Sequence, residues 1–472
     1  MDITLHALDL SLIILYAGVL LVLGLKARRT PGVQVENYLL GGRRLTLVPF
    51  IATLVSTWYG GILGIGEFTY LNGVVTLVIF GLPYYIFAFL YAIFLAARIR
   101  REGVLTIPDR FRRAYGPRSA YFSAIVVFLL TTPAPYLLML GVLINLLMGV
   151  DLWLALLLGM AFSTVYLWRG GFQAVVRTDV LQFVLMFVGF GLLLGVLMSD
   201  QPLGQMWQAL PPELRHWRGA GPLEWQVMLV WFLIASWTFV DPGFYQRCAA
   251  AHDGRTASRG ILLSIGVWFV FDLLTITVGL YAVGQLPELA LISAGPIAAY
   301  PLLGAAVLPP GLRGLFFVAL LAVIMSTIDS FTFISASTLG RDLAGKTTTD
   351  PAIERRRIRW GIAATAGLAY VLALSLPSVV QLWYTLGMVL VPGLLAPMML
   401  TFTRRIILSD TMALIVGLAG VLTAGIWQLT PIVIRHLGGE ASAYPLGLQP
   451  MLPGLLVTLV LVVVFGRFSK SG

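Results

Sequence analysis

Charged residues are scarce in this chain of 472 residues, at 11% of the sequence, whereas 59% of it is hydrophobic. Soluble domains usually carry about 25% charged residues. The apolar residues fall into runs of roughly 18 to 25 residues, each long enough to cross ~30 Å of hydrocarbon. The composition therefore predicts an all-α polytopic membrane protein. No stretch is long and polar enough to form a separate soluble domain.

Cysteine and histidine are also scarce. The single cysteine, Cys248, excludes an intrachain disulfide framework and any cysteine-based metal cluster. The four histidines are scattered without the spacing of metal ligands, and the sequence has no Gly-rich phosphate loop or nucleophile elbow. We therefore expect no enzyme. The net charge of +10 sits mainly in predicted loops, as membrane topology requires, so we expect no nucleic-acid partner.

Thirteen segments are predicted to be membrane helices. Their ranges are 8–26, 48–72, 74–99, 120–149, 152–169, 175–198, 225–245, 259–285, 313–340, 358–376, 379–402, 411–434 and 450–467. The first follows an acidic start and lacks the basic region of a signal peptide, so we expect it to be retained. An odd number of crossings places the two termini on opposite sides of the lipid bilayer.

The basic residues predict the orientation. With the N-terminus outside, only Arg215, Arg218, Arg313 and Arg435 lie on the outer side, so the other 27 of the 31 Lys and Arg residues lie inside. Such a bias marks cytoplasmic loops. We expect an integral protein of the bacterial cytoplasmic (inner) membrane, with its N-terminus outside and its C-terminus in the cytoplasm.

The predicted helices form two blocks of five, over 48–198 and 225–402. Because five crossings are an odd number, the second block enters the membrane in the opposite orientation, as in an inverted repeat. The blocks share no convincing residue identity, so the repeat rests on count and topology. The helix at 8–26 and the pair within 411–467 would be peripheral. The whole chain, 1–472, would form a single transmembrane transporter domain.

Polar residues interrupt the apolar segment 313–340 in the stretch AVIMSTIDSF. Ser326, Asp329 and Ser330 stand at i, i+3 and i+4 and share one helical face, with Thr327 one step around. Clustered oxygen atoms suit a hard cation such as Na+. Hydroxyls alone could equally bond back to carbonyls or join helices. Asp329 favours a functional site, because a carboxylate inside the membrane is costly.

The segment 48–72 has glycines at positions 60, 61, 64 and 66, in its middle third. Clustered glycines allow a helix to break and to expose carbonyls for ions and half-helix ends for substrates. The alternative is that small residues only allow close helix packing. Glu67, just beyond the glycines, would either face the substrate or be solvated near the outer surface.

Two further acids have competing interpretations. Asp179, in the stretch VVRTDVLQF, is a functional acid, a helix-start acid or the ion-pair partner of Arg177. Asp241 is interpreted as mostly structural, at a point where Pro242 and Gly243 end the helix 225–245. No Lys or Arg lies in the middle of any predicted helix.

Four stretches resemble the sodium:solute symporter family, which includes bacterial proline, galactose and sialic acid transporters. They are YLLGGRRLTLVPFIATLVSTWYGG, RTDVLQF, DPGFYQRCAAAHDGRTASRG and LLAVIMSTIDSFTFISASTLGRDL, and they span roughly residues 36 to 345. The resemblance implies the leucine-transporter fold, a five-plus-five inverted repeat with one extra N-terminal and two extra C-terminal helices. The family's plan of thirteen helices, with the N-terminus outside, agrees with the count from hydropathy.

The resemblance also implies ion sites. The main Na+ site would use carbonyls of Leu54, Thr57 and Ala322 or its neighbour Val323, and the hydroxyls of Ser326 and Thr327. The second Na+ site of some members maps onto Asp179, Ser326, Asp329 and Ser330. Asp329 departs from the hydroxyl expected there, so this second group would hold either a second Na+ or a proton.

Substrate residues are carried over by position alone. They are Ser56, Trp58, Tyr59, Gly60, Glu67, Thr132, Trp237, Gln381, Trp383 and Tyr384. We expect a Na+-coupled secondary active symporter that imports a small organic solute by alternating access, without an obligatory protein partner. The two carboxylates keep an H+-coupled symporter open as an alternative. A sensor module is a further alternative, although we expect no signalling domain because the chain ends soon after the last predicted helix.

Overall fold

The computed structural model describes residues 3–25, 35–218, 225–291, 295–344, 350–375, 378–403, 405–436 and 444–468. Nearly all secondary structure in these ranges is helical; the exception is a short antiparallel pair, β1 (Ile406–Ile407) and β2 (Arg467–Phe468). Eleven of the described helices are long and apolar enough to cross a membrane. Two shorter apolar helices, Leu152–Val165 and Met451–Phe465, fall on predicted spans. The all-α membrane fold is confirmed, whereas the count of thirteen stays a prediction.

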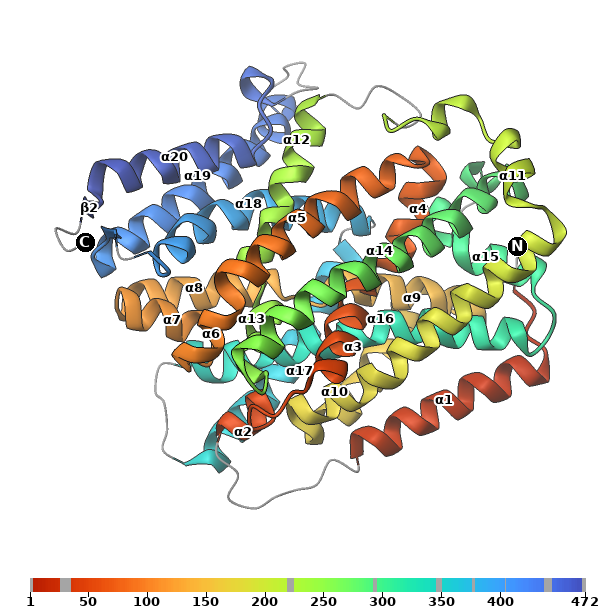
Figure 1. Cartoon of the computed structure of the whole chain (residues 1–472), viewed down its shortest axis with the longest axis horizontal. Coiled ribbons are helices and arrows are strands. Elements are labelled where there is room, and N and C mark those ends of the chain that lie inside the picture. Colours follow the sequence, from red (N-terminus) through yellow and green to blue (C-terminus); the bar gives the residue numbers. More distant parts are fainter. Residues whose placement is uncertain are drawn as a thin grey trace.

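Most of the long helices run along the long axis of the molecule (Figure 1). The N-terminal helix α1 (Ala7–Leu25) begins at one end of this axis, and α20 (Met451–Phe465) ends at the other. Opposite ends are what an odd number of crossings requires. Which end faces the cytoplasm remains a prediction from the basic loops.

The first predicted block begins with an interrupted helix. Helix α3 (Leu47–Trp58) and helix α4 (Ile62–Asn72) are separated by one 3₁₀ turn, η1 (Tyr59–Gly61), where the glycine cluster predicts a break. The rest of the block is η2 (Leu77–Gly81), α5 (Leu82–Tyr91), η3 (Ala92–Ala96), α6 (Ala97–Glu102), α7 (Ile107–Ala114), α8 (Pro117–Leu130), α9 (Ala134–Met148) and α10 (Leu152–Asp200). Helices α8 and α9 are separated at Pro133, which cannot continue the helix of α8.

Helix α10 joins two predicted helices, 152–169 and 175–198, at a sharp kink. The kink is at Gly171, whose φ of 60° and ψ of −169° suit glycine and few other residues. Asp179 therefore lies about two turns beyond the kink. The interpretation of Asp179 as a first-turn acid is wrong, because the second half of the helix begins earlier than its apolar run.

The second predicted block also begins with an interrupted helix. Helix α12 (Trp225–Ile234) passes through the 3₁₀ segment η5 (Ala235–Val240) into α13 (Pro242–Ala250). The block continues with α14 (Gly254–Gln285), η6 (Leu289–Leu291), η7 (Pro296–Ala298), α15 (Ala299–Val307), α16 (Leu312–Ser337), η8 (Thr338–Leu343), α17 (Pro351–Ser375) and α18 (Val379–Leu400). A break in the first helix of each block is what an inverted repeat would produce.

The prediction that Pro242 and Gly243 end this helix is wrong. Asp241 accepts a hydrogen bond from the Phe244 amide at 2.8 Å, and Pro242 follows it in the first turn, so these residues begin α13. Aspartate before proline is a helix-start pattern. As a consequence Arg247, predicted in an inside loop, lies within the candidate membrane span Trp225–Ala250 and is fully buried. Arg247 lies in the last turn of this span, so the prediction that no Lys or Arg lies in the middle of a helix is not contradicted by it.

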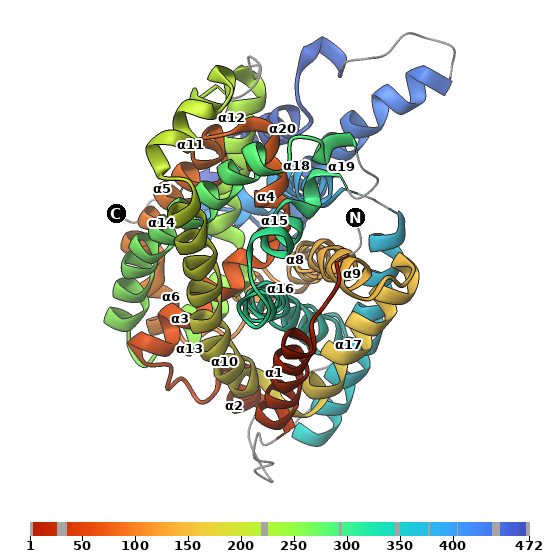
Figure 2. The same cartoon turned by 90° about the vertical axis from the view of Figure 1, so that its right-hand side faces the viewer.

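Helix α16 occupies the centre of the bundle (Figure 2). It packs against α1, α3, α9, α10 and α17, and nearly all of its side chains are buried. Helix α1 is joined to its N-terminal end, because Asp9 accepts hydrogen bonds from Arg313 at 2.7 Å and from the Gly311 amide at 2.7 Å. The remaining elements are α2 (Val35–Leu40), α11 (Leu203–Ala209), η4 (Pro212–Arg215), α19 (Asp410–His436) and η9 (Pro445–Gly447).

Candidate ion and solute site

The interruption between α3 and α4 lies directly against the middle of α16. The Thr327 hydroxyl donates a hydrogen bond to the Thr57 carbonyl at 2.6 Å. This carbonyl belongs to the last turn of α3, where carbonyls lack partners within the helix. A Cβ atom on Gly60 would lie 2.2 Å from Thr327, so only glycine allows the two segments to approach this closely.

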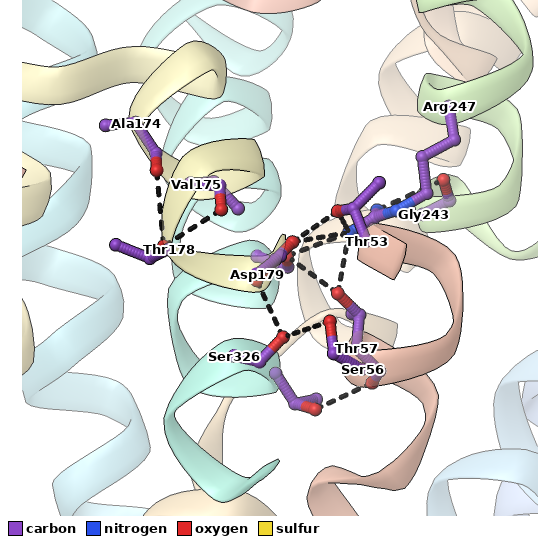
Figure 3. Close-up of polar contacts among 12 residues, drawn as sticks. Thr53, Ser56, Thr57, Ala174, Val175, Thr178, Asp179, Gly243, Arg247 and Ser326 are labelled. Carbon is purple, nitrogen blue, oxygen red and sulfur yellow. Dashed lines mark hydrogen bonds and ion pairs between the residues drawn. The ribbon is translucent and has the colours of Figure 1, made fainter. Parts of the chain in front are cut away.

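A carboxylate from α10 completes this contact. The Ser326 hydroxyl donates to Asp179 Oδ1 at 2.7 Å and is hydrogen-bonded to the Ser56 hydroxyl at 3.0 Å (Figure 3). The Thr53 hydroxyl donates to Asp179 Oδ2. All four side chains are buried. The structure thus gathers hydroxyl and carboxylate oxygens from α3, α10 and α16 at one place, which is the kind of donor set that a hard cation prefers.

Arg247 brings a positive charge to the same place. Its Nη2 donates to the hydroxyls of Thr53, Thr57 and Ser330 at 3.0, 2.7 and 2.9 Å and lies 3.7 Å from Asp179 Oδ2 (Figure 3). Asp179 is therefore paired with Arg247, which settles the alternative of a pair with Arg177. Sequence reasoning missed this arginine, although the Asp-Pro pattern at the start of α13 could have placed it inside the membrane.

The two other residues of the predicted main Na+ site lie nearby. Leu54 is one turn before the end of α3, and Ala322 is buried on α16 one turn before Ser326. Among the residues of the predicted second Na+ or proton site, Asp179 accepts a hydrogen bond directly from Ser326. Asp179 is linked to Ser330 only through Arg247, which pairs with Asp179 and donates to Ser330. A fixed cation therefore stands between Asp179 and Ser330, and it would repel a second ion at that position.

Asp329 is fully buried on α16, the helix that also carries Ser326 and Ser330. Together with Asp179 it lies within electrostatic range of the Tyr16 hydroxyl of α1. That hydroxyl accepts a hydrogen bond from Gln182 Nε2 at 3.1 Å. The polar region around α16 therefore extends from the Arg247 side toward α1 and contains two acids, Asp179 of α10 and Asp329 of α16.

A cavity of about 120 Å³ lies beside this cluster, between the two interrupted helices. Four predicted substrate residues line it: Trp58, Tyr59, Trp237 and Trp383. From the predicted Na+ site, Leu54 and Thr57 line it as well. Its other lining residues come from η1, α4, η2, α5, α9, α12, η5, α13, α14 and α16. The cavity and the ion cluster therefore share the end of α3.

The other predicted substrate residues do not line this cavity. They are Ser56, Gly60, Glu67, Thr132, Gln381 and Tyr384. Ser56 and Gly60 face α16 instead, Tyr384 donates to Gln449 Oε1 at 3.2 Å, and Gln381 is exposed in the first turn of α18. Glu67 is half-buried on α4. These positions were carried over without knowledge of how each helix is rotated, and neighbouring residues on a helix point about 100° apart.

Two carboxylates that sequence reasoning did not assign to the site do line the cavity. Asp241 stands at the start of α13, and Asp272 projects from α14 and accepts a hydrogen bond from the Tyr85 hydroxyl. Tyr84, Tyr136 and other aromatic side chains line the remaining walls. Asp241 opens the stretch DPGFYQRCAAAHDGRTASRG, which carried the family resemblance, but the resemblance assigned no substrate role to it.

Two curated transporters are similar to this chain in sequence. Mouse sodium/glucose cotransporter 1 is 25% identical over 392 residues, covering 71% of this chain and 57% of the relative. The Haemophilus influenzae sodium/pantothenate symporter is 26% identical over 348 residues, covering 71% of each chain. The chain thus matches little more than half the length of the mouse relative.

The fold has a counterpart among solved structures. A Na+-coupled sialic acid symporter in a substrate-bound, outward-open state superposes with a TM-score of 0.77 over 98% of this chain and 99% of that chain, at 15% identity. This likeness shows the fold. The family model described as "Sodium:solute symporter family" matches residues 38–402. The chain therefore belongs to the sodium:solute symporter family.

Proposed function

We propose that the protein is a Na+-coupled symporter that imports a small organic solute by alternating access. Family membership implies Na+ as the co-transported ion. The observation that carries the proposal is the hydrogen bond from the Thr327 hydroxyl to the Thr57 carbonyl at the break after α3, at 2.6 Å, beside the central cavity.

The donor set suits an alkali cation. Carbonyls of Leu54, Thr57 and Ala322 and the hydroxyls of Ser326 and Thr327 would supply five oxygen atoms and no nitrogen or sulfur, as hard cations prefer. The C-terminal end of α3 also carries the partial negative charge of the helix dipole, which favours a cation there. Broken helices are used for ions in this way in other transporters.

The same contact explains how ion and solute binding would be coupled. Trp58 and Tyr59, which line the cavity, directly follow Thr57 in the chain. An ion that fixes Thr57 against α16 would also fix these two side chains in the cavity wall. Each ligand would then raise the affinity for the other by the same factor, as linkage requires.

An H+-coupled symporter is the second candidate. Its supporting observation is the burial of Asp329 and Asp179, both within electrostatic range of the Tyr16 hydroxyl. Two acids in one buried region tend to bind a proton in turn, because both cannot easily be ionised together. Either of these two carboxylates would carry the proton in this candidate.

We place the protein in a bacterial cytoplasmic membrane, with the start of α1 outside. The supporting observations are the apolar spanning helices and the position of the basic residues in the loops. A cysteine introduced near residue 3 and another near residue 466, labelled by an impermeant maleimide in whole cells, test this orientation. Labelling of the second site and protection of the first would contradict it.

A thermal-stability titration of the purified protein tests the ion site without knowledge of the solute. A ligand that binds only the folded state raises apparent stability with its concentration. We expect Na+, but not K+, to raise the melting temperature of the wild type. Thr327→Val keeps the shape but removes the hydroxyl, and should raise the Na+ concentration needed by at least about tenfold.

Ser337→Ala is the matched control, because this hydroxyl on the same helix bonds back to its own helix, to the Phe333 carbonyl at 2.7 Å. It should respond to Na+ as the wild type does. An unchanged response of Thr327→Val would contradict the ion-site assignment. Stabilisation by acid alone, with no response to Na+, would favour the H+-coupled candidate.

A further inference from the structure

Aromatic rings and carboxylates dominate the lining of the central cavity. Ten of its twenty lining residues are aromatic, two are aspartates, and one, Arg247, is basic. The faces of aromatic rings carry negative electrostatic potential and attract cations. A wall of this composition therefore favours a positively charged solute over an anionic one.

The rings are held in fixed positions by one another. Trp58 packs with Tyr84 at a centroid distance of 4.9 Å and with Phe244 at 5.9 Å. Tyr136 packs with Trp383 at 6.0 Å on another part of the wall. These residues come from helices of both predicted blocks, so the rings surround the cavity. Because the rings are already ordered, a cation would lose little binding energy to ordering them.

Asp241 supplies a negative charge among these rings. The Phe244 amide donates to its Oδ1 at 2.8 Å and thereby orients the carboxylate at the start of α13. The hydroxyls of Tyr84 and Tyr136 both lie within electrostatic range of Asp241. The charge therefore faces both groups of rings.

Arg247 does not reverse this charge balance. Its Nη2 is directed at the ion cluster, where it donates to Ser330 at 2.9 Å and lies 3.7 Å from Asp179, while its Nη1 donates to the Gly243 carbonyl beside Asp241 at 3.3 Å. The Arg247–Asp179 pair has no net charge. The two aspartates that remain, Asp241 and Asp272, leave the cavity with an excess of carboxylates.

A polar donor and the cavity size narrow the class of solute further. Trp237 Nε1 is buried, and no residue in the described part of the chain accepts a hydrogen bond from it. Buried donors are normally satisfied, so a solute with an oxygen acceptor would complete this site. The cavity volume of about 120 Å³ is well below that of pockets for drug-sized ligands, which points to a small solute.

We propose that the central cavity takes a small organic ammonium cation, N-methylated or quaternary, that carries a hydroxyl or carbonyl oxygen. The ring faces of Trp58 and Tyr136 contact the alkylated ammonium, Asp241 neutralises it, and Trp237 donates to the oxygen. This assignment rests on the proposed symport function and names the substrate class of the same site.

Binding of matched probes to the purified full-length protein tests the charge. Choline and dimethylbutanol, its neutral carbon analogue, have the same shape and hydroxyl group. Glycine betaine and tetramethylammonium complete the panel, and each is titrated by calorimetry in saturating Na+. We expect choline to bind, and dimethylbutanol to bind at least about tenfold more weakly, because it lacks both the cation–π and the carboxylate attraction.

Asp241→Asn tests the residue that carries the charge. Asparagine caps helices as well as aspartate does, so this variant should keep the start of α13 while losing the negative charge. We expect at least about a tenfold loss of choline affinity. Asp253→Asn is the matched control, because Asp253 caps α14 through the Thr256 amide at 2.7 Å but is exposed outside the cavity. The Asp253→Asn protein should bind choline with the affinity of the wild type.

The Na+ titration of the melting temperature separates this proposal from the function on which it rests. Both variants should keep the wild-type response to Na+. Equal affinity for choline and dimethylbutanol, or an unaltered choline affinity in Asp241→Asn, would overturn the cation assignment. So would the absence of binding by any ammonium probe to protein that still responds to Na+. A wild type that does not respond to Na+ would overturn the symport proposal instead.

Discussion

Replacement of Arg247 by methionine would leave Asp179 buried without its ion-pair partner. At the observed separation of 3.7 Å, two unit charges attract by about 4 kcal/mol with an effective dielectric constant of about 20. Removing one member of a buried pair typically costs about 3–5 kcal/mol, because the other charge stays in place without compensation. We therefore expect Arg247→Met to have a markedly lower melting temperature than the wild type.

A double-mutant cycle with Asp179→Asn separates the pair from the individual side chains. The double variant has no buried charge at either position, so it should recover much of the stability that Arg247→Met loses. The exposed Arg101, which donates to its own helix at the Ala97 carbonyl, provides the control Arg101→Met, with no expected change. Thermal unfolding in the same detergent measures the wild type, the two single variants, the double variant and the Arg101→Met control.

Two results would refute this reasoning. One is an Arg247→Met protein with the same melting temperature as the wild type, which would mean that Asp179 carries no uncompensated charge in the variant. The other is a double variant whose loss equals the sum of the two single losses, which would mean that the two side chains do not interact. Either result would also remove the reason for expecting repulsion of a second cation near Ser330.

Two further substitutions test the packing around α16. Gly60→Ala would place a Cβ 2.2 Å from Thr327, so we expect it to cost about 1–3 kcal/mol and to lower the melting temperature. Gly191→Ala is the control, because nothing lies within 4 Å of the Cβ it would add, and it should leave stability unchanged or raise it. Equal melting temperatures for Gly60→Ala and Gly191→Ala would contradict the close approach of Gly60 to Thr327. Asp9→Ala removes the acceptor for the Gly311 and Arg313 donors, so amide hydrogen exchange in α1 should become faster. Unchanged exchange would mean that this contact does not hold the helix.

The helical ranges could be predicted from the sequence because membrane thickness sets the length of an apolar segment. The break at Tyr59–Gly61 could be predicted as well, since clustered glycines are costly within a helix unless backbone must approach another segment. The polar face of α16 was visible in the spacing of Ser326, Asp329 and Ser330. All three side chains are buried in the bundle.

Helix rotation around the cavity could not be predicted in the same way. Hydropathy gives the depth of a residue in the membrane but not its direction, and the cavity wall depends on the rotation of several helices at once. Ser56 and Trp58 are two positions apart, yet the first faces Ser326 and the second faces the cavity. Gln381 is exposed in the first turn of its helix, whereas Val379 in the same turn is buried.

The start of α13 could not be predicted from the sequence for a different reason. Asp-Pro-Gly is compatible with the end of one helix or the beginning of the next, and the apolar run before it favoured an end. The structure has a beginning, with Asp241 as the cap, so the chain stays in the membrane for two more turns and carries Arg247 with it. A long side chain then reaches Ser330 and Asp179, which no local pattern links to it.

Equilibrium binding of radiolabelled Na+ to the protein in proteoliposomes tests the central claim most directly. The account predicts saturable binding to the wild type and to Ser337→Ala. It predicts at least about a tenfold loss of affinity when Ser326→Ala and Thr327→Ala are combined, since both hydroxyls of the α16 site are then gone. Na+ binding by the double variant with wild-type affinity would contradict the claim that α16 and the break after α3 form the coupling-ion site.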